Sequence, residues 1–451
     1  MLFRKIATTI KDHFTEASNK ILVVEGARQI GKSFIIRHVG SEMFPNFVEI
    51  NLVEDKNGPR YFENVKTTQD FYLVLSSLAG DRLNDSKDTL IFLDEIQEYP
   101  QLLTLLKFLR QDNKYSYVAS GSLLGITLKR TTSIPIGSIR ILKMYPLDLE
   151  EFLIANNVGF DVISNLRSCF DNLQSPLKPI HDNLLYWFKR YLIVGGMPDA
   201  VNEFIATGNV TKIREIQREI HDLYADDASK YDNDNKLKII RIYNLLPSLL
   251  AQKKKRLIFK DIEEKKGKRF ADYLDEVDYL INSGITLATK AISNPRFPLA
   301  ESEEKNLLKL YLNDVGILSC LLFSTNIKPL LDTLESINLG AVYECVVAME
   351  LKSKGHNLFY YDNKKYGEVD FLIDDYDELS VLPIEVKSGK DYYVHSALSR
   401  FVNVKDYHIT KGVVLSNSDQ IEIKNNILYL PIYMVMFLGT PDISNSSTIK
   451  P

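Results

Sequence analysis

Cysteine is scarce in this chain. The 451 residues include three cysteines, Cys169, Cys320 and Cys345, which lie far apart in the sequence. Widely spaced thiols predict neither a disulfide framework nor a cysteine-rich metal site. A protein that does without disulfides suits a reducing compartment, so we expect a cytoplasmic location.

Long apolar runs are also missing. A helix that crosses a bilayer needs roughly 20 apolar residues. The longest candidate, residues 427–438, contains Pro431, and the first residues, MLFRK, lack the apolar core of a secretory signal. We therefore expect no membrane partner.

The chain has little net charge, which is -4 at pH 7. It therefore has no global attraction to nucleic acid, and such contact would need a local patch. Residues 253–256 are Lys-Lys-Lys-Arg, in a region that reads as two helices, a third helix at 270–281 and a strand at 285–289. This order indicates a winged helix-turn-helix. Interspersed acids leave two interpretations open, direct DNA contact and a solvated face of mixed charge. The other basic residues are Lys260, Lys265, Lys266, Lys268 and Arg269.

A phosphate-binding loop is the clearest positive signal. The apolar run at 21–24 is followed by a glycine-rich segment that ends in Lys32 and Ser33, and an apolar helical stretch begins at Phe34. Backbone N–H groups of such a loop converge on phosphate oxygens, Lys32 would neutralise the β- and γ-phosphates, and Ser33 would ligate Mg²⁺. We expect ATP and Mg²⁺ as ligands. The residues predicted to bind ATP are Gly26, Ala27, Arg28, Gln29, Ile30, Gly31, Lys32, Ser33 and Phe34.

Two carboxylates end a second apolar strand. Residues 90–93 are Leu-Ile-Phe-Leu, followed by Asp94 and Glu95. A buried parallel strand delivers such acids to the carboxyl edge of its sheet, where P-loops also lie. Asp94 would hold Mg²⁺ and Glu95 would orient the attacking water. An acid placed for water favours hydrolysis over transfer to a substrate hydroxyl.

A third strand, at 115–119, ends in Ser120, Gly121 and Ser122. Ser120 and Ser122 are candidates to sense the γ-phosphate or the attacking water, and a tight turn is the alternative interpretation. Arg28 and Arg140 are candidates to stabilise transition-state charge in the same protomer or a neighbouring one, and either is equally compatible with a surface ion pair.

The last third of the chain holds a second acidic pattern. Glu344 lies in an apolar helix expected at 339–351, Asp370 in a strand at 367–373, and Glu385 and Lys387 in a strand at 382–387. Alternate residues of a strand face the same side, so Glu385 and Lys387 can converge with Asp370. The acids would bind Mg²⁺ and Lys387 would activate water, with Glu344 completing the cluster. Amphipathic strands with a solvated charged side are the alternative.

These motifs, taken in order, resemble the prokaryotic AAA+ ATPases that carry a C-terminal domain of unknown function similar to PD-(D/E)xK nucleases. The family prefers Pro at position 27 and Thr at position 33, where this chain has Ala27 and Ser33. The resemblance implies an AAA+ sheet, a homo-oligomer in many members, and a nuclease-like fold that need not cut. Further similar landmarks are 93–97, 120–122, 145–152, 195–198 and 313–318.

The expected architecture is α/β with several domains, since 451 residues exceed a single core and the composition is globular. We expect a P-loop AAA+ domain with a parallel sheet, a helical and winged-helix-like region, a mixed α/β domain of restriction-endonuclease-like type, and a loose tail. The respective ranges are 1–155, 156–330, 331–440 and 441–451.

Three functional hypotheses follow. The first is an ATPase whose cycle acts on its C-terminal domain, with DNA or a protein as client. The second is an ATP-regulated, metal-dependent DNA nuclease. The third is a slow nucleotide-dependent interaction switch that cuts no polymer.

Overall fold

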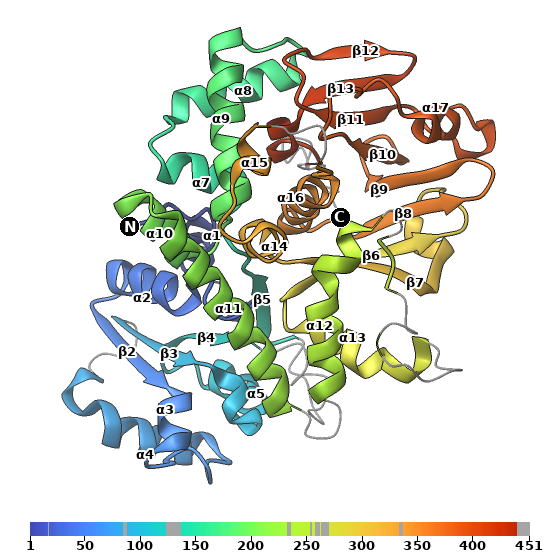
Figure 1. Ribbon diagram of the computed structural model, residues 1–451. Coiled ribbons are helices and arrows are strands. Elements are labelled where there is room, and N and C mark those ends of the chain that lie inside the picture. The colour runs from blue at the N-terminus through green and yellow to red at the C-terminus, as the bar shows by residue number, and fades with distance from the viewer. Residues whose placement is uncertain are drawn as a thin grey trace, which may run out of the picture. The chain divides into compact units, whose positions relative to one another are not determined.

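The computed structural model describes residues 1–16, 18–83, 88–122, 137–231, 236–252, 255–257, 262, 270–332 and 337–439 (Figure 1). The chain divides into two compact units. The amino-terminal unit consists of Met1–Pro146 and Val277–Ile285. The carboxy-terminal unit consists of Leu147–Glu276 and Thr286–Pro451. The first division thus falls after Pro146, whereas the sequence pattern suggested 155.

A parallel sheet forms the centre of the amino-terminal unit. Its strand order is β2-β3-β4-β1-β5, and all four neighbouring pairs are parallel. β1, β3 and β4 correspond to the three strands expected from apolar runs. Because their carboxyl ends share one edge, the residues that follow them are brought together. The strands are β1 Ile21–Glu25, β2 Asn46–Asn51, β3 Thr89–Asp94, β4 Ser116–Gly121 and β5 Ile139–Lys143.

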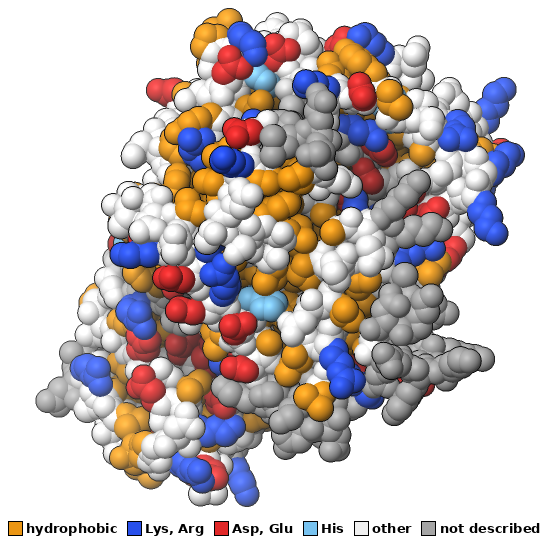
Figure 2. Space-filling view, viewed as in Figure 1, with side chains coloured by type: hydrophobic (Ala, Val, Ile, Leu, Met, Phe, Trp, Pro, Cys, Tyr) orange, Lys and Arg blue, Asp and Glu red, His pale blue; other side chains and the backbone are white. Residues whose placement is uncertain are grey.

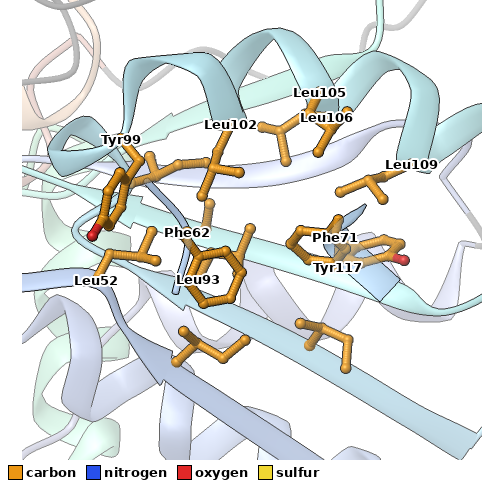
Figure 3. Packing of buried hydrophobic residues seen from close by; sticks show 14 of the residues in the cluster. Leu52, Phe62, Phe71, Leu93, Tyr99, Leu102, Leu105, Leu106, Leu109 and Tyr117 are labelled. Carbon is orange, nitrogen blue, oxygen red and sulfur yellow. The ribbon is translucent and has the colours of Figure 1, made fainter. Parts of the chain in front are cut away.

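Helices cover both faces of this sheet. On one face, leucines of α5 and Phe71 of α4 pack on Leu93 and Tyr117 (Figure 3). On the other, Gly40 of α2 lies so close to Phe47 that an added Cβ would be 2.5 Å from its ring. Residues alternate between the faces along each strand, which explains why β3 is apolar throughout. The helices are α1 Ile6–Thr15, α2 Lys32–Met43, α3 Leu52–Asn57, α4 Thr68–Ala79 and α5 Pro100–Asp112.

A mixed sheet organises the carboxy-terminal unit. Its order among the described residues is β12-β13-β11-β10-β9-β8-β6-β7. The strand expected at 285–289 is β6, which pairs with β7 and, in parallel, with β8. It is therefore part of this large sheet. The strands are β6 Thr286–Ile292, β7 Glu303–Leu312, β8 Leu358–Asn363, β9 Gly367–Asp375, β10 Ser380–Val386, β11 Gly412–Ser416, β12 Glu422–Lys424 and β13 Ile427–Pro431.

Two helices line opposite faces of that sheet. Leu398 and Phe401 of α17 pack against Phe359 and Val414 in one core. α16 is buried along nearly its whole length, from Ala341 to Leu351. Its full burial explains its weak amphipathic pattern, because polar residues such as Glu344 point into the interior and need partners there.

The remaining helices belong to the carboxy-terminal unit, except that most of α13 lies in the segment Val277–Ile285 of the amino-terminal unit. α9, α12 and α14 each contact α16. α13 follows a 3₁₀ turn at Phe270–Tyr273 and matches the helix expected at 270–281. The bounds are α7 Leu149–Ala155, α8 Phe160–Asp171, α9 Lys178–Val194, α10 Pro198–Thr207, α11 Val210–Tyr231, α12 Lys236–Ala251, α13 Leu274–Asn282, α14 Val315–Phe323, α15 Lys328–Asp332, α16 Gly340–Ser353 and α17 Ser396–Val402.

Three sequence landmarks of unassigned role meet inside the carboxy-terminal unit. The carboxylate of Asp314 accepts hydrogen bonds from the N–H groups of Gly196 (2.6 Å) and Ile317 (2.9 Å). The Gly196 carbonyl in turn accepts from the N–H of Leu147 (2.8 Å). A Cβ on Gly196 would lie 2.1 Å from the Leu147 oxygen, so only glycine fits. These residues form a buried packing node.

The surface carries charges of both signs. On the face seen in Figure 2, the coloured Lys, Arg, Asp and Glu side chains are interspersed. Among the described residues, no helix is both long enough and apolar enough to span a membrane.

Candidate functional site

The phosphate-binding loop follows β1 directly. Gly26 has no room for a side chain, since a Cβ would lie 2.3 Å from the Met144 carbonyl oxygen just after β5. Gly31 has φ 90°, a left-handed conformation that favours glycine, and α2 begins at the next residue. The glycines expected for phosphate binding thus have identifiable steric reasons. Phe34, in the first turn of α2, is 56 % exposed.

Lys32 is the buried cation of the loop. Its side chain is 4 % exposed, and its Nζ donates to the Ala27 carbonyl at 2.9 Å. The same Nζ lies 3.9 Å from Oε1 of Glu95. Burial lowers the pKa of Lys32, while Glu95 and Asp94 act in the opposite direction. Lys32 is therefore held over its own loop, with its charge balanced by the two acids that end β3.

Asp94 lies beside Ser33, the residue in the first turn of α2 that the sequence predicted to bind Mg²⁺. Ser33 Oγ donates to Asp94 Oδ1 at 2.8 Å, and Ser120 Oγ donates to the same oxygen. Burial raises the pKa of Asp94, and the two serine hydrogen bonds oppose that effect. A hydroxyl and a carboxylate oxygen are the hard ligands that Mg²⁺ prefers, so this pair fits the cation expected from the sequence.

Glu95 is fixed in position from two sides. Its backbone has φ 56°, and its Oε2 accepts from Ser122 Oγ at 2.9 Å and Gln97 Nε2 at 2.5 Å. Burial is the largest influence on the pKa of Glu95 and raises it. Lys32, Gln97 and Ser122 together outweigh burial, so the pKa ends below its ordinary value. Glu95 is thus an oriented, ionised carboxylate, as a group that positions water must be.

The two serine candidates contact the acids. Ser120 Oγ also accepts from the Glu95 N–H at 3.1 Å, so it bridges both acidic residues. Arg28 is half-buried, and its charge lowers the pKa of both Lys32 and Glu95. It therefore lies within electrostatic reach of this site.

Arg140 lies elsewhere on the same sheet. It is the second residue of β5 and pairs in register with Leu22, near the start of β1. At about 3.3 Å per residue, this register position is about 13 Å along the strand from Gly26. Its charge instead lowers the pKa of His13 in α1. Within one chain, the structure does not bring Arg140 to the phosphate loop.

Sequence reasoning missed two residues that support the loop. Arg4 is 8 % exposed and donates to the carbonyls of Ile30 (3.0 Å) and Tyr145 (2.6 Å). An arginine ahead of the first helix carries no sequence signal for this role. Gln97 orients Glu95, and it ends the landmark at 93–97, where the sequence pattern assigned it no role of its own.

The second acidic pattern also converges, within the carboxy-terminal unit. Asp370 Oδ2 accepts from the Val386 N–H at 2.9 Å, which places it beside Glu385. Lys387 Nζ donates to Glu385 Oε1 at 2.7 Å. Burial, Glu385 and Glu344 raise the pKa of Asp370 well above its ordinary range. All four predicted residues therefore belong to one neighbourhood.

Further lysines that the sequence pattern did not indicate contact this neighbourhood. Lys255 Nζ pairs with Glu344 Oε1, and Lys309, whose side chain is fully buried, pairs with Glu368. Among the described residues, no group of three or more His, Cys, Asp and Glu side chains is arranged to hold a metal ion. The predicted metal ligands are close, but the carboxylates face lysines and backbone donors.

Most of the basic stretch in the middle of the chain lies outside the described residues. Lys255 and Arg256 are described, and Arg256 pairs with Asp362 of β8. The residues outside the described part include Lys253, Lys254, Lys260, Lys265, Lys266, Lys268 and Arg269.

Three family models match successive parts of the chain. Residues 18–153 match the family model of an AAA domain. Residues 185–328 and 339–435 match two models described as domains of unknown function, DUF8612 and DUF4143. A search of curated proteins finds no match.

Several solved structures are similar at low identity. A Walker-type ATPase of Pyrococcus abyssi is 12% identical, with a TM-score of 0.44, over 71% of this chain and 96% of that one. Cdc6p of Pyrobaculum aerophilum is 12% identical, with a TM-score of 0.26, over 75% and 96%. The RuvB Holliday junction branch migration motor of Thermotoga maritima is 15% identical, with a TM-score of 0.29, over 66% and 90%.

The match at 18–153 covers the parallel sheet, the P-loop, and Asp94 and Glu95 at the end of β3. The amino-terminal part of this chain is therefore similar to AAA domains and contains a P-loop on a parallel sheet.

Proposed function

We propose that this protein binds ATP and hydrolyses it with Mg²⁺. The observation that carries the proposal is the contact between Ser33 and Asp94 at 2.8 Å, with Lys32 Nζ 3.9 Å from Glu95. Residues from the P-loop after β1 and from the end of β3, another strand of the same sheet, thus meet in the arrangement that phosphoryl transfer to water requires. The matched AAA domain supports the same reaction.

Each side chain has a separate task in this mechanism. The loop N–H groups and the N-terminus of α2 bind the phosphates, and Lys32 neutralises their charge. Ser33 and Asp94 would hold Mg²⁺, which when bound would supply further charge neutralisation on the phosphate oxygens. Glu95, oriented by Ser122 and Gln97, accepts a hydrogen bond from the attacking water and aligns it with the γ-phosphate.

Two substitutions test the site. Lys32→Ala should abolish nucleotide binding or turnover. Glu95→Gln should retain bound ATP and slow hydrolysis about 100-fold or more, because the amide cannot act on the water as the carboxylate does. Phosphate release and binding of a fluorescent ATP analogue would be measured on each variant.

Glu98→Gln is the matched control. Glu98 lies three residues beyond Glu95, is partly exposed and pairs with Lys56 at 3.1 Å. This variant should hydrolyse ATP at the wild-type rate. Normal turnover in both Lys32→Ala and Glu95→Gln would refute the site assignment.

We further propose that the ATP cycle acts on the carboxy-terminal unit, with DNA or a protein as client. A homo-oligomer would allow Arg140 of one protomer to serve a neighbouring site, as the sequence suggested. A client would be identified by its stimulation of the ATPase rate. A mixture of Arg140→Ala and Glu95→Gln subunits, assayed for ATPase activity with that client, would test whether Arg140 of one protomer serves the site of another.

A second candidate function is metal-dependent cleavage of DNA in the carboxy-terminal unit. The observation that favours it is Glu385 Oε2, a buried carboxylate oxygen without a hydrogen-bond partner in the described structure. A buried acceptor of this kind is costly unless a cation or donor satisfies it. Asp370 and Glu385 would hold the metal, and Lys387 would activate water, as the sequence predicts.

DNA cleavage assays with Mg²⁺ or Mn²⁺, with and without ATP, test this candidate. Cutting that is lost in Lys387→Ala while ATP turnover persists would support an ATP-regulated nuclease. Wild-type protein that cuts neither single- nor double-stranded DNA would exclude this candidate and favour a nucleotide-dependent interaction switch.

A further inference from the structure

Glu344 is engaged on both of its oxygens. Lys255 Nζ pairs with Oε1, and the Tyr311 hydroxyl donates to Oε2 at 2.8 Å. Glu344 is 3 % exposed, and the Lys255 side chain is 12 % exposed, so water screens this ion pair weakly. The carboxylate of Glu344, which the sequence predicted to complete a cation site, is thus already neutralised by the ammonium of Lys255.

The charges around Glu344 do not balance. Three lysines each pair with one acid: Lys255 with Glu344, Lys309 with Glu368, and Lys387 with Glu385. Within the described residues, Asp370 forms no ion pair, and Glu385 Oε2 has no hydrogen-bond partner. The neighbourhood therefore has capacity for one more cation next to Asp370 and Glu385.

We propose that Lys255 competes with a divalent cation for Glu344, so that this lysine sets the metal affinity of the acidic cluster. The inference rests on the second candidate function and deepens it. A divalent cation held by Asp370 and Glu385 would repel a nearby ammonium, and it would gain Glu344 as a ligand only when Lys255 releases that carboxylate.

Because Lys255 lies far from the acids in the sequence, movement of its own segment would control the metal affinity of the acidic cluster. Lys255 lies 89 residues before Glu344, just after α12, whereas Asp370, Glu385 and Lys387 lie on or directly beyond β9 and β10. Two neighbouring contacts hold it there: Arg256 pairs with Asp362, and the Leu257 N–H donates to the Leu308 carbonyl of β7 at 3.1 Å. The competing charge thus comes from a different part of the sequence than the acids.

Direct titration with Mn²⁺, in the absence of nucleotide and nucleic acid, tests the proposal. The full-length chain would carry Asp94→Asn in every variant, which removes a ligand of the P-loop cation. Electron paramagnetic resonance of free Mn²⁺ gives the affinity without any need for activity. Lys255→Met should bind Mn²⁺ about tenfold more tightly than the parent, a gain comparable with other changes around metal ligands.

Matched variants separate charge from loosened packing. Lys255→Arg retains the cation and should leave the affinity unchanged, whereas Lys255→Gln removes the charge and should reproduce the gain. Tyr311→Phe removes the other hydrogen bond to the same carboxylate without changing charge, and should give no gain. If Lys255→Met does not fold, the Gln variant carries the test.

The failures are distinguishable. If the parent binds Mn²⁺, Glu385→Gln abolishes that binding, and neither neutral Lys255 variant binds more tightly, then the competition is refuted while the metal site stands. If neither the parent nor any Lys255 variant binds Mn²⁺, both the metal site and the competition are refuted.

Discussion

The charged side chains of the P-loop site are buried, so water cannot replace an interaction partner that a substitution removes. Lys32 and Asp94 are buried, and Glu95 is largely so. Each is held by at least one neighbour that approaches from another segment of the chain. Removing a supporting residue should therefore affect both stability and nucleotide binding.

Arg4 provides the first test at this scale. Arg4→Met should lower the free energy of unfolding by about 2 kcal/mol, because two charge-assisted hydrogen bonds to buried carbonyls are lost. It should also raise the KM for ATP, since one of those carbonyls belongs to Ile30 in the phosphate loop. Urea unfolding and steady-state kinetics measure the two effects.

Arg37→Met serves as the control for Arg4. Arg37 is half exposed and pairs with Glu49 at 2.6 Å on the surface. Loss of such a pair should change stability by about 0 to 1 kcal/mol and leave KM unchanged. Equal effects of the two variants would contradict a bracing role for Arg4.

Asp314 should make stability depend on pH. Burial raises the pKa of Asp314 from 3.8 to about 6, against the hydrogen bonds from Gly196 and Ile317. The folded state thus binds a proton more tightly than the unfolded state. The stability contributed by protonated Asp314 is complete below about pH 4 and is lost as pH rises through 6, a change of about 3 kcal/mol.

Urea midpoints between pH 4 and pH 7 measure this dependence. Asp314→Asn cannot ionise, so its stability should vary less with pH in this window than that of the wild type, whatever its absolute value. Parallel curves for the two proteins would show that Asp314 does not titrate as described.

At the scale of elements, close backbone contacts decide which residues are tolerated. Gly196→Ala should destabilise the protein by about 3 kcal/mol, because the new Cβ would overlap the Leu147 backbone in the packing node. Gly389→Ala is the control, since a Cβ there meets nothing within 4 Å. A thermal midpoint unchanged in both variants would disprove the packing role of Gly196.

The sequence predicted helices and strands best where a local pattern of apolar residues was sufficient to define them. β3 is a continuous apolar run because both faces of its sheet are covered, and α5 shows its apolar stripe because one side faces Leu93 and Tyr117. The sequence indicated a P-loop after one apolar strand and two acids at the end of another, and in the structure Ser33 and Lys32 lie close to Asp94 and Glu95.

Contacts between distant segments were beyond sequence reasoning. Arg4, Lys255 and Lys309 carry no local pattern that links them to Ile30, Glu344 or Glu368. The strand near 285 was predicted, but its partners were not, since pairing of β6 with β8 depends on side chains almost 70 residues away. Local periodicity does not encode such partners.

At the scale of the whole molecule, nucleotide should stabilise one unit selectively. The P-loop, Asp94 and Glu95 all belong to the amino-terminal unit. A ligand at 100 times its Kd adds about 2.7 kcal/mol to the unit that binds it. Differential scanning calorimetry with a non-hydrolysable ATP analogue should therefore show one thermal transition moving upward more than the other.

Lys32→Ala should remove that shift, whatever its effect on the transitions without nucleotide. A single transition that moves upward as a whole in the wild type would instead indicate that the two units unfold as one cooperative block.

The division of the chain has an evolutionary consequence. The backbone passes from one unit to the other after Pro146, Glu276 and Ile285, so the short segment Val277–Ile285 belongs with a sheet encoded far upstream. A single recombination event after Pro146 would separate that segment from its own unit. An exchanged amino-terminal unit would have to fit a Val277–Ile285 segment that comes from the other gene. We therefore expect the two units to be inherited together.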